Sequence, residues 1–145
     1  MPAVQSTYNA TIANGAVGQV ADLSLSDVIS RECEPASIGF GVAVVQGTAD
    51  HQAKTGAAGV FIGITVRDVT LDARRNDAYA QYDTMGVMTK GVIWVTAGEA
   101  VVAGDVVYRT TAGVLNKTSS GNTLIANARW ETSAGNGALA KLRLS

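Results

Sequence analysis

Residues 89–116 read TKGVIWVTAGEAVVAGDVVYRTTAGVLN, a series of short apolar runs separated by glycine-containing turns. The run 91–95 combines β-branched residues with a tryptophan, and the runs 101–102, 106–108 and 114–115 follow it. Successive runs are separated by glycine beside a small or acidic residue, which is a turn signal. Short β-branched runs with turn signals at intervals of roughly 8–12 residues are typical of a β-sandwich or barrel.

Period-two alternation extends this β pattern to both sides of the stretch. Alternate residues of a strand point to opposite faces, so an apolar set at every second position predicts one buried face. The sets predicted to share a face are Phe40, Val42 and Val44; Val60, Ile62, Ile64 and Val66; Leu124, Ala126, Ala128 and Trp130; and Ala140, Leu142 and Leu144. The chain is therefore predicted to be all-β, a jelly-roll-like sandwich or barrel.

Two segments do not follow the strand pattern. Residues 23–29 fit alternation in part and a helical turn in part, so their structure is left open. Residues 72–82 carry charges and tyrosines without an apolar stripe, which predicts a long loop joining two strands rather than a helix. No segment combines convincing helix start and stop signals.

The 145 residues are sufficient for one domain with a sizeable core, predicted over residues 21–145. Residues 1–20 are poor in large apolar side chains and contain the turn signal Asn14-Gly15, so they are predicted to form an extended N-terminal arm. Such an arm alone buries too little apolar area to offset its ordering entropy. We expect it to be ordered by a neighbouring subunit.

The charge balance and hydropathy exclude several classes of partner. The formal net charge is −1, and Arg74-Arg75 is the longest basic run, whereas nucleic-acid binding needs clustered cations. The longest apolar stretch, 56–66, is interrupted by glycine and threonine and is shorter than the roughly 20 residues of a membrane-spanning helix. The N-terminus has neither the basic start nor the apolar core of a secretory signal, so we expect synthesis in a cytoplasm.

Reactive side chains are scarce. One cysteine and one histidine, Cys33 and His51, cannot supply the three or four ligands that zinc usually takes, and no phosphate-binding glycine motif occurs. We therefore expect no metal, no cofactor and no catalytic residue. A small hydrolase using His51 beside Asp50, or Cys33, is the least favoured alternative, because Asp50 and His51 lie in turn-like sequence.

A carrier or ligand-binding β domain is a further alternative. Lys90 followed by the turn at 103–105 is similar to the modified lysine region of biotinyl and lipoyl carriers. However, Lys90 leads directly into the strand predicted at 91–95 and does not lie at a hairpin tip.

Aromatic residues divide into predicted core and predicted surface. Trp94 and Trp130 lie in alternating strands and are expected to fill the core. The candidate interface lies in the charged loop 74–82, because tyrosine and arginine are enriched where proteins contact one another. Its candidate contact residues are Arg74, Arg75, Tyr79 and Tyr82.

The order of the strand and turn segments resembles a known family. The segments are 38–44 (IGFGVAV), 61–65 (FIGIT), 90–95 (KGVIWV), 103–108 (AGDVVY) and 127–132 (NARWET). As an ordered set they resemble the small capsid cement, or decoration, proteins of tailed bacteriophages. The resemblance covers about residues 30 to 144 and excludes the arm and the 74–82 loop.

This resemblance implies a structural virion protein with a jelly-roll-like fold and no catalysis. It implies that the chain, made in the host cytoplasm, binds the outer surface of an assembled capsid and bridges neighbouring major capsid subunits. The expected partners are the major capsid protein and further copies of the chain itself. A symmetric oligomer is expected, because such a protein would occupy shell symmetry positions; a homodimer is favoured and a homotrimer is the alternative.

Overall fold

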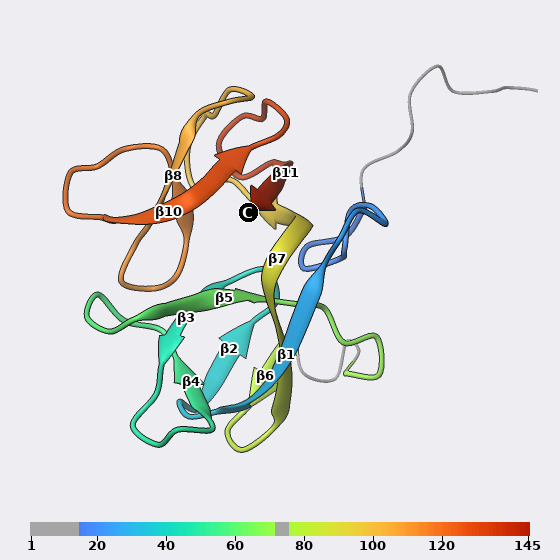
Figure 1. The fold of residues 1–145 in the computed structure, drawn as a ribbon, viewed down its shortest axis with the longest axis vertical. Helices are drawn as coiled ribbons and strands as arrows, with labels where there is room; N and C mark the ends of the chain where they lie inside the picture. The colour runs from blue at the N-terminus through green and yellow to red at the C-terminus, as the bar shows by residue number, and fades with distance from the viewer. Residues whose placement is uncertain (1–14, 72–75) are drawn as a thin grey trace, which may run out of the picture.

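The computed structural model describes residues 15–71 and 76–145, and every regular element within these ranges is a β-strand (Figure 1). The all-β prediction is confirmed. None of the described residues forms a helix that could cross a membrane. The strands are β1 (Asp27–Cys33), β2 (Ser37–Gly39), β3 (Ala43–Gln46), β4 (Gln52–Lys54), β5 (Phe61–Thr65), β6 (Ala78–Ala80), β7 (Thr84–Thr96), β8 (Val106–Arg109), β9 (Leu115–Asn116), β10 (Thr123–Trp130) and β11 (Leu139–Leu144).

The first barrel is formed by β1, β4, β3, β5 and the first half of β7. These strands pair in that order, and β1 also pairs antiparallel with β7, so the ring is closed. Only the β1–β4 pairing within this ring is parallel. Strands β2 and β6 form a separate two-stranded sheet that contributes Ile38 and Tyr79 to the same core as Cys33, Val44 and Val87.

The second barrel continues from the other half of β7 through β11, β10, β8 and β9. It also returns to its starting strand, because Leu115 in β9 bridges Ala97 just beyond the end of β7. The amide of Gly98 donates to the carbonyl of Leu115 at 2.9 Å. Trp130 fills the core of this barrel, and Figure 1 shows the second barrel above the first.

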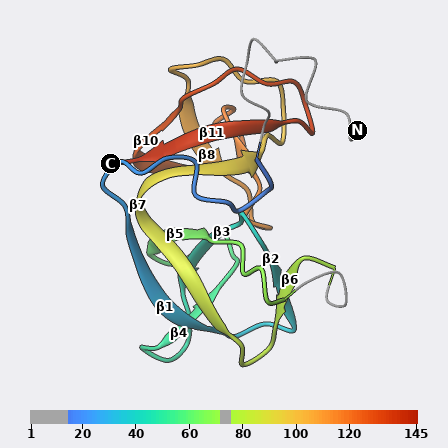
Figure 2. The same ribbon diagram turned by 90° about the vertical axis from the view of Figure 1, so that its right-hand side faces the viewer.

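The 13-residue strand β7 belongs to both barrels. Residues 84–90 pair with β1, and residues 91–96 pair with β11. Gly91 stands at the junction with φ 127°, and a Cβ there would lie 2.8 Å from the Cβ of Ser26. Because glycine has no Cβ, β7 can pass close to the segment that contains Ser26. Figure 2 shows the strand curving from one barrel into the other.

The face predicted for Phe40, Val42 and Val44 is confirmed in part, because Phe40 and Val44 lie in the core of the first barrel and Val42 packs against it. Gly41 adopts φ 67° in a turn, and the strand begins only at Ala43. From there neighbouring residues are buried in succession rather than alternately, because β3 runs between two cores. Ala43 belongs to the core cluster of the second barrel and Val44 to that of the first.

Other predicted strands are confirmed over part or all of their length. The set Ala140, Leu142 and Leu144 is buried in β11 as predicted. The strand predicted around 60–66 corresponds to β5, although Val60 is exposed. The predicted strand at 101–102 is absent, because only Val101 forms a bridge before the chain turns. The segment left open at 23–29 enters strand β1 at Asp27.

Part of the predicted N-terminal arm packs on the second barrel. The amide of Gly18 donates to the carbonyl of Trp94 at 2.7 Å, and the amide of Trp94 donates to the carbonyl of Gln19 at 2.9 Å. The amide of Ala21 donates to the carbonyl of Val92 at 2.9 Å. The boundary predicted at residue 20 thus falls inside a segment bonded to β7. The rest of the predicted arm, residues 1–14, lies outside the described residues.

Candidate interaction surfaces

The predicted 74–82 contact loop has a short strand at its centre. Arg74 and Arg75 lie outside the described residues. Tyr79 lies in β6 and is only 2 % exposed. Its ring meets the edge of Phe40 at a centroid distance of 5.1 Å, and its hydroxyl donates to the carbonyl of Val66. Burial raises the pKa of the Tyr79 hydroxyl. Tyr79 is therefore a core residue that holds the segment in place.

Tyr82, by contrast, is 70 % exposed in the turn between β6 and β7. The turn is fixed to the end of β1, because the amide of Tyr82 donates to the carbonyl of Cys33 at 2.8 Å. The side chain of Gln81 adds a bond to the carbonyl of Glu34 at 3.0 Å. Tyr82 has φ 70°, a left-handed conformation that costs a residue other than glycine about 1–2 kcal/mol. A strained, rigid turn thus displays an aromatic side chain to solvent.

The candidate catalytic residues do not form a catalytic arrangement. The exposed imidazole of His51 lies 3.7 Å from the carboxylate of Glu32. Cys33 is buried, and its Sγ lies 3.4 Å from the carbonyl oxygen of Pro35. Burial, with smaller contributions from Asp83 and Glu32, raises the pKa of the Cys33 thiol to about 11, so the thiol stays protonated at neutral pH.

The remaining chemical alternatives also lack a site among the described residues. Lys90 lies within β7 opposite Asp27 and not at a hairpin tip, unlike a carrier lysine. Across residues 15–71 and 76–145, no group of three or more His, Cys, Asp or Glu side chains could hold a metal ion. The exposed surfaces of the two barrels are therefore the candidate sites of interaction.

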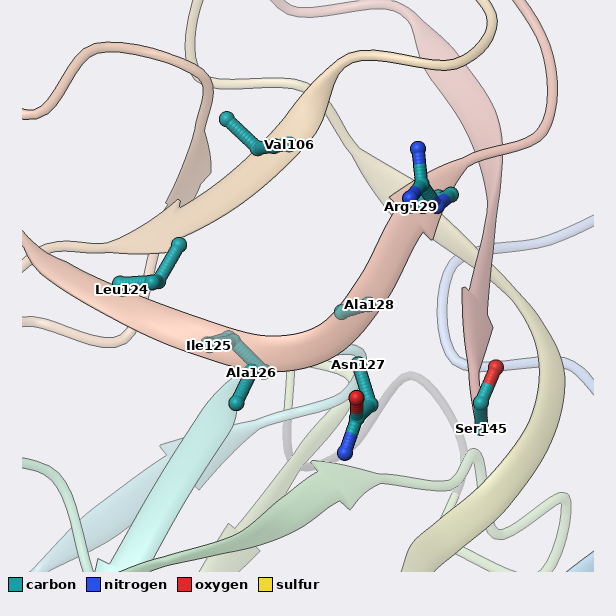
Figure 3. A pocket seen from close by; sticks show the side chains of 8 residues that line it. All are labelled: Val106, Leu124, Ile125, Ala126, Asn127, Ala128, Arg129 and Ser145. Carbon is teal, nitrogen blue, oxygen red and sulfur yellow. The ribbon is translucent and has the colours of Figure 1, made fainter.

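A pocket of about 280 Å³ opens in the second barrel where β8 and β10 separate (Figure 3). Leu124 pairs with Tyr108 and Arg129 pairs with Val106, so four residues of β10 lie opposite one residue of β8. Asn127 has φ 59° within this bulge, and its carbonyl accepts a bond from the amide of Ser145 at 2.9 Å. Asparagine tolerates this conformation better than most residues.

The bulge changes which side chains face the core. Ile125, Ala128 and Trp130 are buried, whereas Leu124 is 52 % exposed. The face predicted from Leu124 to Trp130 is therefore right for its second half and wrong for its first, because the bulge shifts the alternation. Val106 on β8 is also exposed, by 47 %, so two apolar side chains lie at the pocket.

The charges beside the pocket are unevenly compensated. Arg143, directly opposite Arg129 on β11, bonds to the carboxylate of Glu131, which raises the pKa of Arg143. The Arg129 side chain has no hydrogen bond or ion pair with any described residue. The pocket thus combines exposed apolar side chains with a guanidinium that has no partner among residues 15–71 and 76–145. Sequence reasoning missed this site, and Asn127 within a strand was the available signal of a bulge.

A comparison with family models finds one match, described as "Structural cement protein (E217 gp24/Pam3 gp6)", over residues 4–145. The matched residues include both barrels. No curated protein sequence matches the chain.

Two solved structures share the fold. A chain from the capsid of Myoviridae phage XM1 aligns with a TM-score of 0.78 at 18% sequence identity, covering 100% of this chain and 98% of that one. The N base of head fiber gp8.5 from bacteriophage phi29 aligns with a TM-score of 0.54 at 13% identity, covering 83% of this chain and 95% of the other.

Proposed function

The chain belongs to the phage structural cement protein family, and from this premise we propose that it binds the outer capsid surface and bridges neighbouring major capsid subunits. It is a structural protein of the virion and not an enzyme. The observation that carries the proposal is the family match over residues 4–145.

Mass action explains how such a protein stabilises a shell. A ligand that binds only the assembled state stabilises it by about 2.7 kcal/mol per site at a hundredfold excess over Kd. Because a shell offers many equivalent sites, modest affinity at each is sufficient.

The positions of the exposed side chains support bridging. Leu23 and Leu25 are exposed just before β1 begins, whereas Tyr82 is exposed in the turn bonded to the far end of β1. A bridging protein needs separate contact points on one stiff body. The pairing of β1 with β7 supplies that stiffness, because it joins the first and last strands in the pairing order of the first barrel and so closes it.

The proposed partners are the major capsid protein and a second copy of the chain. A symmetric oligomer suits a protein at shell symmetry positions, and a homodimer is favoured over a homotrimer because two-fold dimers are the commonest soluble oligomers. Light scattering coupled to gel filtration measures the mass of the free protein. A monomer at tens of micromolar would exclude a pre-formed oligomer and leave only assembly on the shell.

Co-sedimentation with expanded shells that lack cement tests the proposed function. We expect saturable binding to shells, an increase in the temperature at which they disassemble, and much weaker binding to isolated capsid subunits. Equal binding to subunits and shells would contradict bridging, and absence of binding to shells would contradict the function itself.

Of the two described candidate contact residues, Tyr79 is buried and Tyr82 is exposed, and we propose Tyr82 as a contact. Tyr82→Asn removes the ring and places a residue better suited to φ 70° in the turn. The variant is expected to unfold at the same or higher urea concentration while binding shells more weakly. Unchanged shell binding would remove Tyr82 from the contact.

A further inference from the structure

The pocket between β8 and β10 is a preformed feature of the backbone. Its opening follows from the unequal register, in which four residues of β10 face one of β8. Because Trp130 and Ile125 anchor the two sides of the bulge in the core, the exposed Leu124 and Arg129 are held at fixed positions. Figure 3 shows β10 curving through the pocket with Leu124 before the curve and Arg129 at its end.

Charge determines what this pocket can accept. Arg143 is neutralised locally by Glu131, whereas Arg129 beside it has no partner within the described part of the chain. A guanidinium presents several N–H donors in a planar fork that matches a carboxylate. Val106 and Leu124 offer apolar area next to it. The complementary ligand is a carboxylate adjoining an apolar side chain.

We propose that this pocket receives an acidic segment of the major capsid protein, with its carboxylate on Arg129 and a neighbouring apolar side chain against Val106 and Leu124. The inference rests on the proposed function and adds the location and chemistry of one contact. It also assigns β10 as a capsid-facing element of the second barrel, in addition to the turn of the first barrel that carries Tyr82.

Charge reversal at the pocket provides the test. Arg129→Glu is compared with Lys90→Glu, which makes the same charge change at another exposed position, on β7. Arg129→Lys keeps the charge but loses the fork, and Leu124→Ser removes apolar area. Both mutated pocket residues are exposed, so each variant should keep the unfolding midpoint of the wild type. Binding is measured by co-sedimentation with cement-free expanded shells at low and high salt.

We expect Arg129→Glu to raise the Kd for shells by about tenfold or more, Leu124→Ser and Arg129→Lys to raise it less, and Lys90→Glu to leave it unchanged. The difference between wild type and Arg129→Glu should shrink at high salt, because screening weakens the pair.

If the wild type binds shells and Arg129→Glu binds them with the same Kd as Lys90→Glu, this inference is overturned and the proposed function stands. Absence of wild-type binding would overturn both. Loss of a solution oligomer by Arg129→Glu, with shell binding intact, would assign the pocket to a second copy and also overturn the inference.

Discussion

Gly63 lies where β5 passes close to the backbone of β7. A Cβ at this position would lie 2.1 Å from the carbonyl oxygen of Met88 and 2.9 Å from Val87 Cγ1, and backbone cannot move aside as a side chain can. Gly63→Ala should therefore lower the free energy of unfolding by about 1–3 kcal/mol, the usual cost of overpacking. Urea denaturation measures the loss.

Gly135→Ala is the matched control for this prediction, since nothing lies within 4 Å of the added methyl group. Its unfolding free energy should stay within about 0.5 kcal/mol of the wild type, as for most surface substitutions. Equal stability of the two variants would show that β5 and β7 can move apart without cost, and would contradict the prediction that the Gly63 contact is tight.

Tyr79 and Tyr82 show how far the candidate site could be predicted from residue types. Both belong to one charged segment, and composition gave them the same expected role. Their burial differs because Tyr79 pairs with Ile38 in the β2–β6 sheet, a contact between residues 41 positions apart. Tyr82 follows in the turn and has no such partner strand. Local sequence thus identified the segment but not which tyrosine is exposed.

At the scale of elements, β11 and β10 differ in how well alternation predicts burial. Ala140, Leu142 and Leu144 are all buried because β11 pairs without interruption with β7. In β10 the register against β8 shifts after Leu124, and the inward face changes with it. A bulge depends on the partner strand as well as on its own residues. The pocket beside it was therefore beyond a reading of β10 alone.

Glu99 connects the turn after β7 to the chain after β9 and should make stability depend on pH. Its carboxylate accepts bonds from the Thr118 hydroxyl at 2.8 Å and from the amides of Lys117 and Thr118 at 2.7 Å. The Thr118 hydroxyl is the largest cause of a pKa below the ordinary 4.5 of Glu99. The stabilisation is therefore complete above the unfolded-state pKa and is lost as the pH falls through the folded-state pKa.

Glu99→Gln should thus lower the urea midpoint at pH 7, and the difference from wild type should shrink in a second measurement at acid pH, below the folded-state pKa of Glu99. Asp50→Asn is the control, because the Asp50 carboxylate has no hydrogen bond or ion pair with a described residue. A constant difference between wild type and Glu99→Gln at both pH values would exclude this carboxylate as a source of acid sensitivity.

The segment before β1 gives a prediction about truncation. Deleting residues 1–14 leaves the bonds of Gly18, Gln19 and Ala21 to β7 in place, so the unfolding midpoint should match the wild type. Deleting residues 1–21 removes these bonds and exposes the edge of β7, and the midpoint should fall. If the predicted arm contacts a neighbouring subunit, the shorter deletion should also weaken shell binding, measured by co-sedimentation.

Equal midpoints for both deletions would show that residues 15–21 add nothing to the barrel. A lower midpoint for the 1–14 deletion would instead make that part of the arm integral to the domain.

At the scale of the whole molecule, the sequence predicted an all-β domain but not two barrels that share a strand. Closing the first barrel requires pairs such as Ile29 with Val87, and closing the second requires Ala97 to meet Leu115. These pairs join distant or turn-separated residues, and no periodicity within one strand encodes them. Glycine at position 91 allowed β7 to bend, yet in sequence it reads as part of a turn-rich stretch.

The shared strand leads to a prediction about cooperativity. Val87 and Met88 are neighbours in β7 that enter the cores of the first and second barrel respectively. Arg109 adds a connection, because its buried guanidinium on β8 donates to the carbonyl of Gly56 in the loop before β5. Unfolding either barrel therefore removes a wall of the other, and the free protein should unfold in a single transition.

Two probes can distinguish the barrels, because both tryptophans, Trp94 and Trp130, lie in the second. Tryptophan fluorescence should report the same urea midpoint as hydrogen exchange at the amides of β3 and β4 in the first barrel. Arg109→Met should shift both midpoints down together, since it removes the hydrogen bond from the buried guanidinium to the half-buried Gly56 carbonyl. Two separate midpoints in the wild type would mean that β7 does not couple the cores, and that a load on one barrel is not transmitted to the other.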